Sequence, residues 1–537
     1  MTSSKVIQQL IIDIIASQPQ NLADFMRAKK KFSKNIKLAP PSNATLLSHY
    51  RQLVKQKKIK ASPNLEKWLI KRPTRTLSGV SVITVLTKPW PCPGQCVYCP
   101  SEPDMPKSYL SNEPAAQRAV RNLFDPYRQV QARIQALENN GHQVDKIEIL
   151  ILGGTWSAYP ARYQTWFVGR LFQAANNYNK TKRPYKGLAA EQKINETTRY
   201  RIIGLTMETR PDHIDRKEIK RLRELGCTRV QLGVQHTDDK ILSYIQRGDS
   251  LANAIQATRL LKEAGLKVDH HYMPDLPGST PAKDLAMFKY VYNSGQLSPD
   301  QIKIYPCVVN PHAQLYGWWK QGKYKPYSVK QLADLLIKVK LLTPPWIRIN
   351  RLVRDIPKTS ISAGNSITNL RQLLQDRLKT EGKECQCIRC REARGRKSNI
   401  NKAKLNINKY SASQGKEYFI SYTSPDKKII YGFVRLRFNT PAANIVFSVL
   451  KKAALIRELH VYGQMQPVYD ETMDDAVSRP HVQHRGLGRK LMNVAEDIAR
   501  QHGYETMAVI AGIGVREYYR KIGYQLKDTY MLKTIKK

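Results

Sequence analysis

Three cysteines near the start of the chain are spaced closely enough to share one inorganic group. Cys92, Cys96 and Cys99 form a C-x3-C-x2-C pattern. Three thiolates can hold three corners of a 4Fe–4S cube and leave the fourth iron without a protein ligand. S-adenosylmethionine (SAM) can chelate such an open iron, and its reductive cleavage yields a 5′-deoxyadenosyl radical. The triplet therefore predicts a 4Fe–4S cluster that activates SAM.

Zinc and a disulfide are the two alternatives for this triplet. Zinc usually takes a fourth Cys or His at short spacing, and none follows before His142. The chain has only 8 cysteines in 537 residues, which suits a reducing cytoplasm better than a disulfide scaffold. The sequence therefore favours the cluster, in a cytoplasmic protein.

A second group of cysteines lies much further along the chain. Cys385, Cys387 and Cys390 form a C-x-C-x2-C pattern, which supplies three ligands of the kind that zinc prefers. We predict Cys307 as the fourth ligand, because the only other unassigned thiol sits beside a helix stop. His312 is the alternative fourth ligand, and a set of reduced structural thiols is the alternative to zinc.

The elements that position these residues follow from the hydrophobic pattern. From residue 80 onward, apolar runs typical of strands alternate with amphipathic helices. Repeated β-α units predict a parallel sheet or barrel, and six of them make an open, three-quarter barrel. The first cysteine triplet follows the first strand, so we expect the cluster at the carboxyl-end mouth of the barrel. The expected strands are 80–86, 147–152, 201–207, 229–233, 268–273 and 301–306.

Residues that follow other strands are expected at the same mouth. Gly153 and Gly154 come after the second strand, where glycines let backbone amides approach a ligand such as the SAM amino group. Glu208 ends the third strand and could accept hydrogen bonds from ribose hydroxyls. Gln235 ends the fourth strand. These four residues are the predicted SAM contacts.

The last part of the chain has a different pattern. Runs at 430–438, 454–461 and 507–510 predict antiparallel strands, and a glycine loop, Gln483-His-Arg-Gly486-Leu-Gly488-Arg489, opens a helix between the last two. Such a loop presents backbone N–H groups to an anion, and the helix dipole adds to that field. Acetyltransferases of the GNAT superfamily hold the coenzyme A pyrophosphate in this way. The run 518–524 follows where the closing helix and strand of such a domain are expected.

The charge balance is strongly positive. The chain has 89 Lys and Arg against 43 Asp and Glu, a formal net charge of +46. A surplus of this size fits a polyanionic partner bound through phosphates, although a Lys-rich source composition could explain part of it. Residues 1–72 are especially basic and predict small helices that track phosphates, with a solvated helical cap as the alternative. We favour nucleic acid as the partner.

The sequence predicts four segments, none of which contains an apolar run of membrane-spanning length. The first residues lack the features of a signal peptide. Residues 391–409 are polar and basic and are expected to be an exposed connection. The predicted segments are 1–72 (basic, helical), 73–360 (barrel), 361–411 (linker with the zinc site) and 412–537 (GNAT domain).

A radical SAM barrel followed by a GNAT domain resembles the family of the Elongator catalytic subunit and its single-protein counterparts in archaea and bacteria. The likeness covers most of the chain and rests on phrases that occur in one order. Beside the cysteine triplet these are Arg75-Thr-Leu-Ser-Gly79, Asp125-Pro-Tyr, Gly153-Gly-Thr, Glu208-Thr-Arg-Pro-Asp212, Met273-Pro-Asp-Leu-Pro277, Lys323-Tyr-Lys-Pro-Tyr-Ser328, Pro344-Pro-Trp346, Arg354-Asp-Ile-Pro357, Arg457-Glu-Leu-His-Val-Tyr-Gly463 and Tyr518-Tyr-Arg-Lys-Ile-Gly-Tyr524.

The resemblance implies an activity. It implies that the wobble uridine of tRNA is converted to 5-carboxymethyluridine with SAM and acetyl-CoA. Polar acyl transfer cannot make the required carbon–carbon bond, because carbon five of uracil is not acidic and the acetyl methyl is not a leaving group. A radical on the acetyl methyl can add to the base, provided that the base is splayed out of the anticodon loop.

The resemblance also implies roles for single residues. Cys92, Cys96 and Cys99 would ligate the cluster. The acetyl-CoA contacts would be Lys146 from the barrel, Glu458, Leu459, His460 and Val461 beside the pantetheine arm, Leu487, Gly488 and Arg489 (with Gln483 and Gly486) at the pyrophosphate, and Tyr519. Tyr518 and Tyr519 would lie at the thioester as the catalytic pair.

Other functions remain as alternatives. The first is a protein lysine acetyltransferase with a merely structural Fe–S cluster. Others are a radical tRNA modifier with a second cluster at the later cysteines, and a tRNA-binding scaffold. Accessory subunits and self-association are left open by the sequence.

Overall fold

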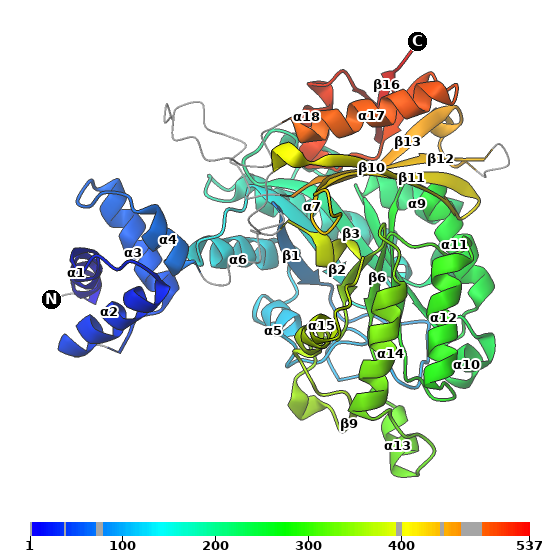
Figure 1. Ribbon diagram of the computed structural model, residues 1–537, viewed down its shortest axis with the longest axis horizontal. Helices are drawn as coiled ribbons and strands as arrows, with labels where there is room; N and C mark the ends of the chain where they lie inside the picture. The colour runs from blue at the N-terminus through cyan, green and yellow to red at the C-terminus, as the bar shows by residue number, and fades with distance from the viewer. Residues whose placement is uncertain are drawn as a thin grey trace.

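The computed structural model describes residues 3–36, 39–70, 79–393, 400–440, 445–462 and 486–536. The described chain forms an N-terminal helical module, a barrel and a second sheet (Figure 1). The helical module stands to one side and touches the barrel through helix α6, whereas the second sheet packs directly on the barrel.

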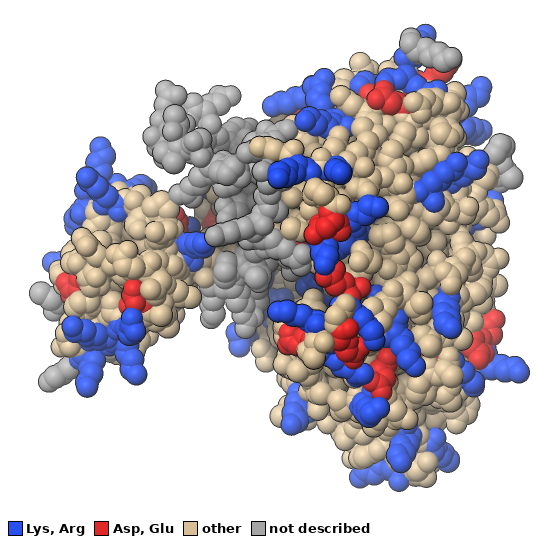
Figure 2. Space-filling view, viewed as in Figure 1, with Lys and Arg blue, Asp and Glu red and all other residues tan. Residues whose placement is uncertain are grey.

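The N-terminal module consists of α1 (Ser3–Ala16), α2 (Leu22–Asn35), α3 (Asn43–Lys55) and α4 (Pro63–Leu69). The helices enclose a small apolar core of their own that includes Leu10, Phe25 and Leu47. Side chains of Asn21, Ser42 and Ser62 cap the last three helices by accepting from backbone N–H groups. Figure 2 shows Lys and Arg gathered at the ends of this module, where α2 and the turn after α3 expose Lys residues.

The barrel is a single sheet of seven parallel strands in chain order. They are β1 (Ser81–Leu86), β2 (Lys146–Leu152), β3 (Arg201–Thr209), β4 (Arg229–Gln235), β5 (Lys267–Tyr272), β6 (Gln301–Ile304) and β8 (Arg348–Arg351). The predicted partial β/α barrel is confirmed. The seventh strand, β8, was not predicted, because its sequence Arg-Ile-Asn-Arg is short and mostly charged.

Helices connect these strands and cover the outside of the sheet (Figure 1). They are α5 (Pro114–Arg121), α6 (Pro126–Asn139), α7 (Ala161–Asn177), α8 (Leu188–Asn195), α9 (Arg216–Glu224), α10 (Asp239–Tyr244), α11 (Leu251–Glu263), α12 (Pro281–Asn293), α13 (Leu315–Lys320) and α14 (Val329–Leu342), with 3-10 turns at Trp156–Ala158, Pro211–His213 and Lys358–Ser360. The main apolar core lies between sheet and helices. No helix of the described ranges is long and apolar enough to cross a bilayer.

A short segment joins the barrel to the second sheet. It contains β9 (Ala363–Gly364), then α15 (Leu370–Thr380) and α16 (Ile388–Arg391). Strand β9 pairs with β7 (Val308–Val309), which lies earlier in the chain, directly after β6. Residues 391–409 were expected to be an exposed connection. Their last part instead forms β10 (Lys404–Ala412), an edge strand with mostly exposed side chains that pairs with β11.

The second sheet has the order β10-β11-β12-β13-β14-β16-β15. Its other strands are β11 (Gly415–Thr423), β12 (Ile430–Phe438), β13 (Ala453–Val461), β14 (Thr506–Val509), β15 (Gln525–Lys527) and β16 (Tyr530–Thr534), with α17 (Leu487–Gln501), α18 (Arg516–Arg520) and 3-10 turns at Ile400–Lys402, Ser448–Leu450 and Ile513–Val515. The prediction that its strands are antiparallel was wrong for β13 and β14, which pair in parallel. Helix α17 connects these two strands, and a helical crossover allows parallel pairing.

The second sheet is joined to the amino-terminal ends of the barrel strands. Arg457 of β13 forms ion pairs with Asp300, just before β6, and with Glu417 of β11, and all three side chains are fully buried. Lys262 of α11 pairs with the same two carboxylates. Arg435 of β12 donates to the Trp346 carbonyl oxygen at the start of β8. These charges lie between the two sheets and tie them together.

Gly512 allows a close approach on another part of this interface. A Cβ at this position would overlap the carbonyl oxygen of Ile203 in β3. We expect Gly512→Ala to lower the free energy of unfolding by about 1–3 kcal/mol, since two backbones would have to separate. Gly317→Ala is the control, because Gly317 lies in α13 with open space around it and Ala favours a helix. Equal denaturant midpoints for both variants would contradict the proposed close packing.

Candidate active site

One cavity of about 1050 Å³ runs through the lumen of the barrel. At one end it is lined by Tyr98 and Pro100 of the cysteine loop, and at the other by Tyr518 and Tyr519 of the second sheet's domain. Inward-facing residues of the barrel strands form its wall: Glu148, Leu150 and Leu152 of β2; Glu208 of β3; Arg229, Gln231 and Gln235 of β4; Lys267 and His271 of β5; Gln301 and Lys303 of β6; Arg348 and Asn350 of β8. A single space therefore connects the two predicted reaction centres.

The cysteine loop follows β1, at the carboxyl end of the barrel as predicted. Cys92 Sγ lies 3.5 Å from Thr155 Oγ1, and Cys96 Sγ lies 3.5 Å from Arg247 Nη1. Among the described residues, the three sulfurs of this loop do not form a group in which all lie within 4.8 Å of one another. A single tetrahedral zinc would hold them ~4 Å apart, since Zn–S bonds are about 2.3 Å. The wider spacing fits a cluster better than one ion.

Glu208 and Gln235, two predicted SAM contacts, line the cavity. Glu208 Oε2 accepts from the Tyr109 hydroxyl at 2.6 Å, and its Oε1 lies 3.7 Å from His271 Nδ1. Gln235 has a left-handed backbone (φ 71°), and its buried Oε1 has no hydrogen-bond partner. Non-glycine residues in this conformation are uncommon and gather at ligand sites. The orphaned oxygen fits a ligand that donates an N–H or O–H group.

The two glycines after β2 were also predicted to contact SAM, but they do not line the cavity as Glu208 and Gln235 do. Gly153 and Gly154 have positive φ angles of 143° and 92°. A Cβ on Gly153 would overlap Thr87 Oγ1, so packing against the end of β1 already requires glycine there. The residues that line the cavity do not include either glycine.

The predicted acetyl-CoA strand is β13. Its pairing with β14 ends at Ile456 and Val509, whereas β13 continues to Val461, and a β-bulge interrupts its pairing with β12. Glu458, Leu459 and His460 line the cavity. The two strands therefore part next to the cavity, which leaves room for an extended arm between them.

Glu458 and His460 have different electrostatic surroundings. Glu458 pairs with Lys267 of β5 at 3.1 Å and with Arg435 at 3.0 Å. Burial alone would raise the pKa of Glu458, but Lys267 and Arg435 outweigh it and hold that pKa at about 2. Burial lowers the pKa of His460 to about 4, and its ring stacks on Phe433 with Nε2 unpartnered. Glu458 is thus a fixed anion, and His460 is neutral at pH 7.

The glycine loop and the tyrosine pair lie close together. Gly486 has φ 68° and stands at the N-terminus of α17, followed by the buried Leu487. A Cβ on Gly488 would meet the Tyr518 hydroxyl at 3.0 Å, so this turn closely approaches α18. Burial raises the pKa of both Tyr518 and Tyr519, which keeps their hydroxyls protonated as donors.

Three more residues were predicted to contact acetyl-CoA, namely Arg489, Lys146 and Gln483. Arg489 is the third residue of α17, and its charge acts on Tyr518. Lys146 begins β2 away from the cavity wall, and burial lowers its pKa. Gln483 lies outside the described residues.

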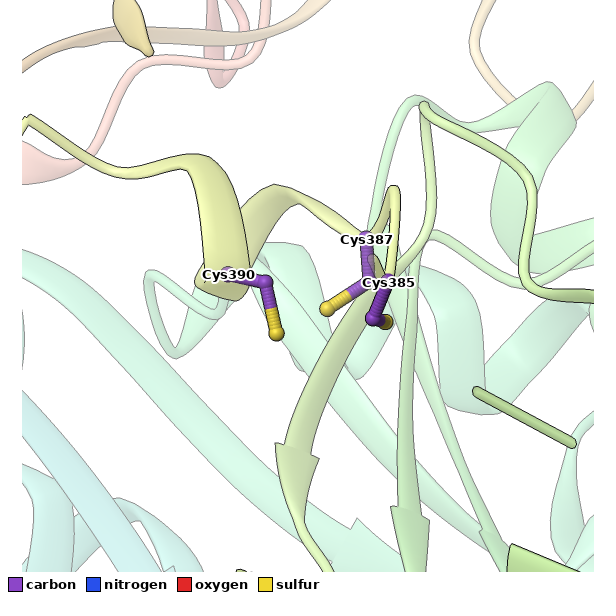
Figure 3. Close-up of side chains that lie close together, drawn as sticks. All are labelled: Cys385, Cys387 and Cys390. Atoms are coloured by element: carbon purple, nitrogen blue, oxygen red, sulfur yellow. The ribbon is translucent and has the colours of Figure 1, made fainter. Parts of the chain in front are cut away.

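The later cysteines form a compact group. The sulfurs of Cys385, Cys387 and Cys390 all lie within 4.8 Å of one another, and Figure 3 shows Cys385 and Cys387 just before α16 and Cys390 on that helix. The Lys340 ammonium lies 3.6 Å from Cys390 Sγ. The backbone N–H of Ile388 donates to Ile347 at the start of β8. The group therefore sits at the amino-terminal end of the barrel, and its spacing suits one tetrahedral ion.

The prediction of Cys307 as the fourth ligand was wrong. Among the described residues, the metal-ligating group contains neither Cys307 nor His312. Cys307 follows β6 at the carboxyl end, where it packs in an apolar cluster with Val97 and Tyr324. The two sets of thiols thus lie at opposite ends of the barrel, which sequence spacing alone could not reveal.

Sequence reasoning gave no role to several other residues of the lumen. His271, Lys303 and Gln231 occupy alternate, inward positions of their strands, and each is at most 7% exposed. The signal was present as polar residues alternating with apolar ones, as in Arg229-Val-Gln231-Leu. That pattern also fits a solvated strand face, so it needed the fold to be interpreted.

Comparisons with known proteins agree with this geometry. The Radical SAM superfamily matches residues 92–290, the Radical_SAM C-terminal domain matches residues 299–380, and the Acetyltransferase (GNAT) family matches residues 407–524. The fold and the cavity thus define a radical SAM protein with a GNAT domain.

Relatives that match over most of the chain identify the family more narrowly. The chain is 40% identical to the tRNA uridine(34) acetyltransferase of Methanocaldococcus jannaschii over 92% of its own length and 91% of that protein. It is 36% identical to Elongator complex protein 3 of Homo sapiens, over 87% and 86% of the two lengths. A solved structure of archaeal Methanocaldococcus infernus Elp3, lacking residues 1–46, matches with 38% identity and a TM-score of 0.73, over 85% of this chain and 99% of that one. The chain belongs to the Elongator complex protein 3 family.

Proposed function

We propose that this protein modifies the wobble uridine of tRNA and forms 5-carboxymethyluridine from SAM and acetyl-CoA. The observation that carries the proposal is the single cavity between the cysteine loop and the GNAT tyrosines. A reaction that joins an acetyl carbon to a base needs both reactants in one space shielded from water. The names of the relatives support uridine 34 of tRNA as the target.

In this proposal the barrel residues hold the radical source. Cys92, Cys96 and Cys99 ligate a 4Fe–4S cluster, and Gln235 and Glu208 bind SAM. With both bound, the site would supply a 5′-deoxyadenosyl radical, which is able to take hydrogen from a methyl group. Gly153 and Gly154 shape the loop beside Thr87 rather than the cavity wall.

The GNAT residues hold the acyl donor. The backbone of Glu458, Leu459, His460 and Val461 pairs with the pantetheine arm where β13 and β14 part, and Gln483, Gly486, Leu487, Gly488 and Arg489 hold the pyrophosphate at the start of α17. Tyr519 and Tyr518 place protonated hydroxyls at the thioester, where they can donate to the departing thiolate. Lys146 would contact acetyl-CoA from the barrel side.

The basic N-terminal module supports tRNA as the partner. Its exposed Lys residues offer cations to the phosphate backbone, which supplies most of the affinity for RNA. None of the eight cysteines, all of which lie in the described ranges, forms a disulfide, which supports a cytoplasmic location.

We also propose that Cys385, Cys387 and Cys390 bind zinc. We expect Cys387→Ser to lose one equivalent of zinc while the iron content stays unchanged, measured by elemental analysis of the purified protein. Cys307→Ser is the matched control and should keep its zinc, because Cys307 lies outside the group. Equal zinc in wild type and Cys387→Ser would leave the group as structural thiols, and extra iron there would indicate a second cluster.

The decisive experiment follows a labelled acetyl group. Anaerobically reconstituted protein is incubated with tRNA, SAM and carbon-labelled acetyl-CoA, and the nucleosides are then separated. Label in 5-carboxymethyluridine, dependent on SAM, is the expected result. Label only on lysine, without need for SAM, would overturn the proposal in favour of a protein lysine acetyltransferase.

A further inference from the structure

The lumen of the barrel is polar where comparable barrels are packed with branched apolar side chains. Lys303 of β6 faces this lumen and is 7% exposed. Within the described ranges no carboxylate oxygen lies within 4.0 Å of its ammonium, although the other lumen cations, Arg229, Lys267 and Arg348, each pair with a carboxylate. A buried cation is costly unless an anion or strong acceptor meets it.

Two polar atoms on the neighbouring strands beside Lys303 lack hydrogen-bond partners. The Lys303 ammonium donates to Gln231 Oε1 at 2.5 Å, and this contact fixes which end of the amide faces the lysine, because an ammonium only donates. The other end, Gln231 Nε2, is buried without a hydrogen-bond partner. His271, the register partner of Lys303 on β5, likewise has an unpartnered Nε2.

The three groups face one cavity from three strands. Gln231 lies on β4, His271 on β5 and Lys303 on β6, and these residues are 0%, 5% and 7% exposed. An ammonium and an amide N–H directed into the same space form a binding site for an oxygen that carries full or partial negative charge. The three residues are placed in the barrel, between the cysteine loop and the GNAT tyrosines.

We propose that Lys303 and Gln231, with His271 in its Nε2–H form, bind the acyl oxygen of the two-carbon unit that is transferred to the base. This inference rests on the proposed function. The oxygen is a thioester carbonyl oxygen in acetyl-CoA and a carboxylate oxygen in the product. Hydrolysis breaks the carbon–sulfur bond, water supplies the second carboxylate oxygen, and one proton and the CoA thiol are released.

Oxygen binding at Lys303 would direct the acetyl methyl into the barrel, while the thioester sulfur stays on the side of Tyr518 and Tyr519. Lys303 is a positioning residue in this scheme, since it binds the oxygen and not the carbon that reacts. The carboxylate of the product is the stronger ligand, because it carries a full charge.

The test compares two tRNAs that differ only in one group, which is a carboxylate in one and a neutral amide in the other. One carries 5-carboxymethyluridine at the wobble position, and the other carries the neutral, equally sized 5-carbamoylmethyluridine. We expect the full-length wild-type protein to bind the carboxylate tRNA about 10- to 100-fold more tightly than the amide tRNA. Lys303→Gln, which can still donate to Gln231, should bind both tRNAs equally.

Two further variants separate charge from folding. Lys303→Arg keeps the cation and should retain part of the preference, whereas Lys338→Met, on the exposed face of α14, should leave the preference unchanged. An equal loss of affinity for both tRNAs in Lys303→Gln would overturn the inference, because it would indicate contact with the base instead of the acyl group. An unchanged preference in Lys303→Gln would overturn it as well.

The pH dependence gives an independent readout. Burial lowers the pKa of Lys303 to about 8, with Asp269 opposing that shift. The preference for the carboxylate should therefore fall as pH rises through about 8 in wild type and persist in Lys303→Arg, whose guanidinium stays charged. The titratable groups around Lys303 are Asp269 and His271 on β5, Glu208 on β3, Arg229 on β4, Arg351 on β8 and Tyr305 after β6.

Failure of this inference can be told from failure of the proposed function. If wild type produces labelled 5-carboxymethyluridine but shows no charge preference, only the role of Lys303 is wrong. If wild type produces none, the proposed function is wrong, whatever the binding data show.

Discussion

Cys96→Ser is expected to reduce formation of the modified nucleoside by at least about 10³-fold, because the proposed radical source depends on all three thiolates. The Cys96 sulfur of the cysteine loop faces Arg247, which lies between α10 and α11, and a serine hydroxyl at position 96 is a poor ligand for iron. The anaerobically reconstituted variant should lose its visible absorption and most of its iron. Binding of acetyl-CoA should be unchanged, since the GNAT domain lies at the other end of the barrel.

Cys227→Ser is the matched control for this variant. The Cys227 thiol is buried and donates to the Arg229 carbonyl oxygen, a contact that serine can keep. This control should retain both iron and activity. A Cys96→Ser protein that kept its iron and turned over at the wild-type rate would refute the radical mechanism.

The second large effect concerns the buried charges between the two sheets. Arg457→Met should lower the free energy of unfolding by about 3–5 kcal/mol, because Asp300 and Glu417 would lose a shared buried cation. Denaturant unfolding followed by circular dichroism measures this loss. Arg377→Met is the control, since its partners lie on the surface, and it should leave the free energy of unfolding almost unchanged.

The same charges give wild type an acid-sensitive stability. Burial would raise the pKa of Glu417, but Arg457 and Lys262 outweigh it and hold that pKa at about 2; the pKa of Asp300 is likewise held well below its usual range. Since these pKa values are depressed in the folded state, the stabilisation is complete above the unfolded values near pH 4 and is lost as pH falls toward 2. A stability that stayed flat between pH 5 and pH 2 would contradict this account.

Much of the fold was predictable because its signals are local. The strand-like runs at 80–86 and 147–152 became β1 and β2 with small changes at their ends. The order of cysteine loop, β-α units and glycine loop also identified the radical SAM barrel and the GNAT fold. Each of these features depends on residues that are close in sequence.

What could not be predicted depends on residues that are far apart in sequence. Strand β8 has almost no apolar signal of its own and exists because β6 offers it a partner. The parallel pairing of β13 with β14 depends on where α17 packs. Cys307 and Cys385 were assigned to one site by elimination, whereas the barrel separates them.

The interface formed by Arg457, Asp300 and Gly512 has a consequence for the choice of acyl donor. Because it fixes the two halves in one orientation, the span from the cysteine loop to Tyr519 is constant. A donor must cover that span with its own flexible arm, so thioesters with a truncated arm would be rejected for their length even when their acyl group is correct. The protein would in this way select its co-substrate by the length of the arm as well as by the acyl group.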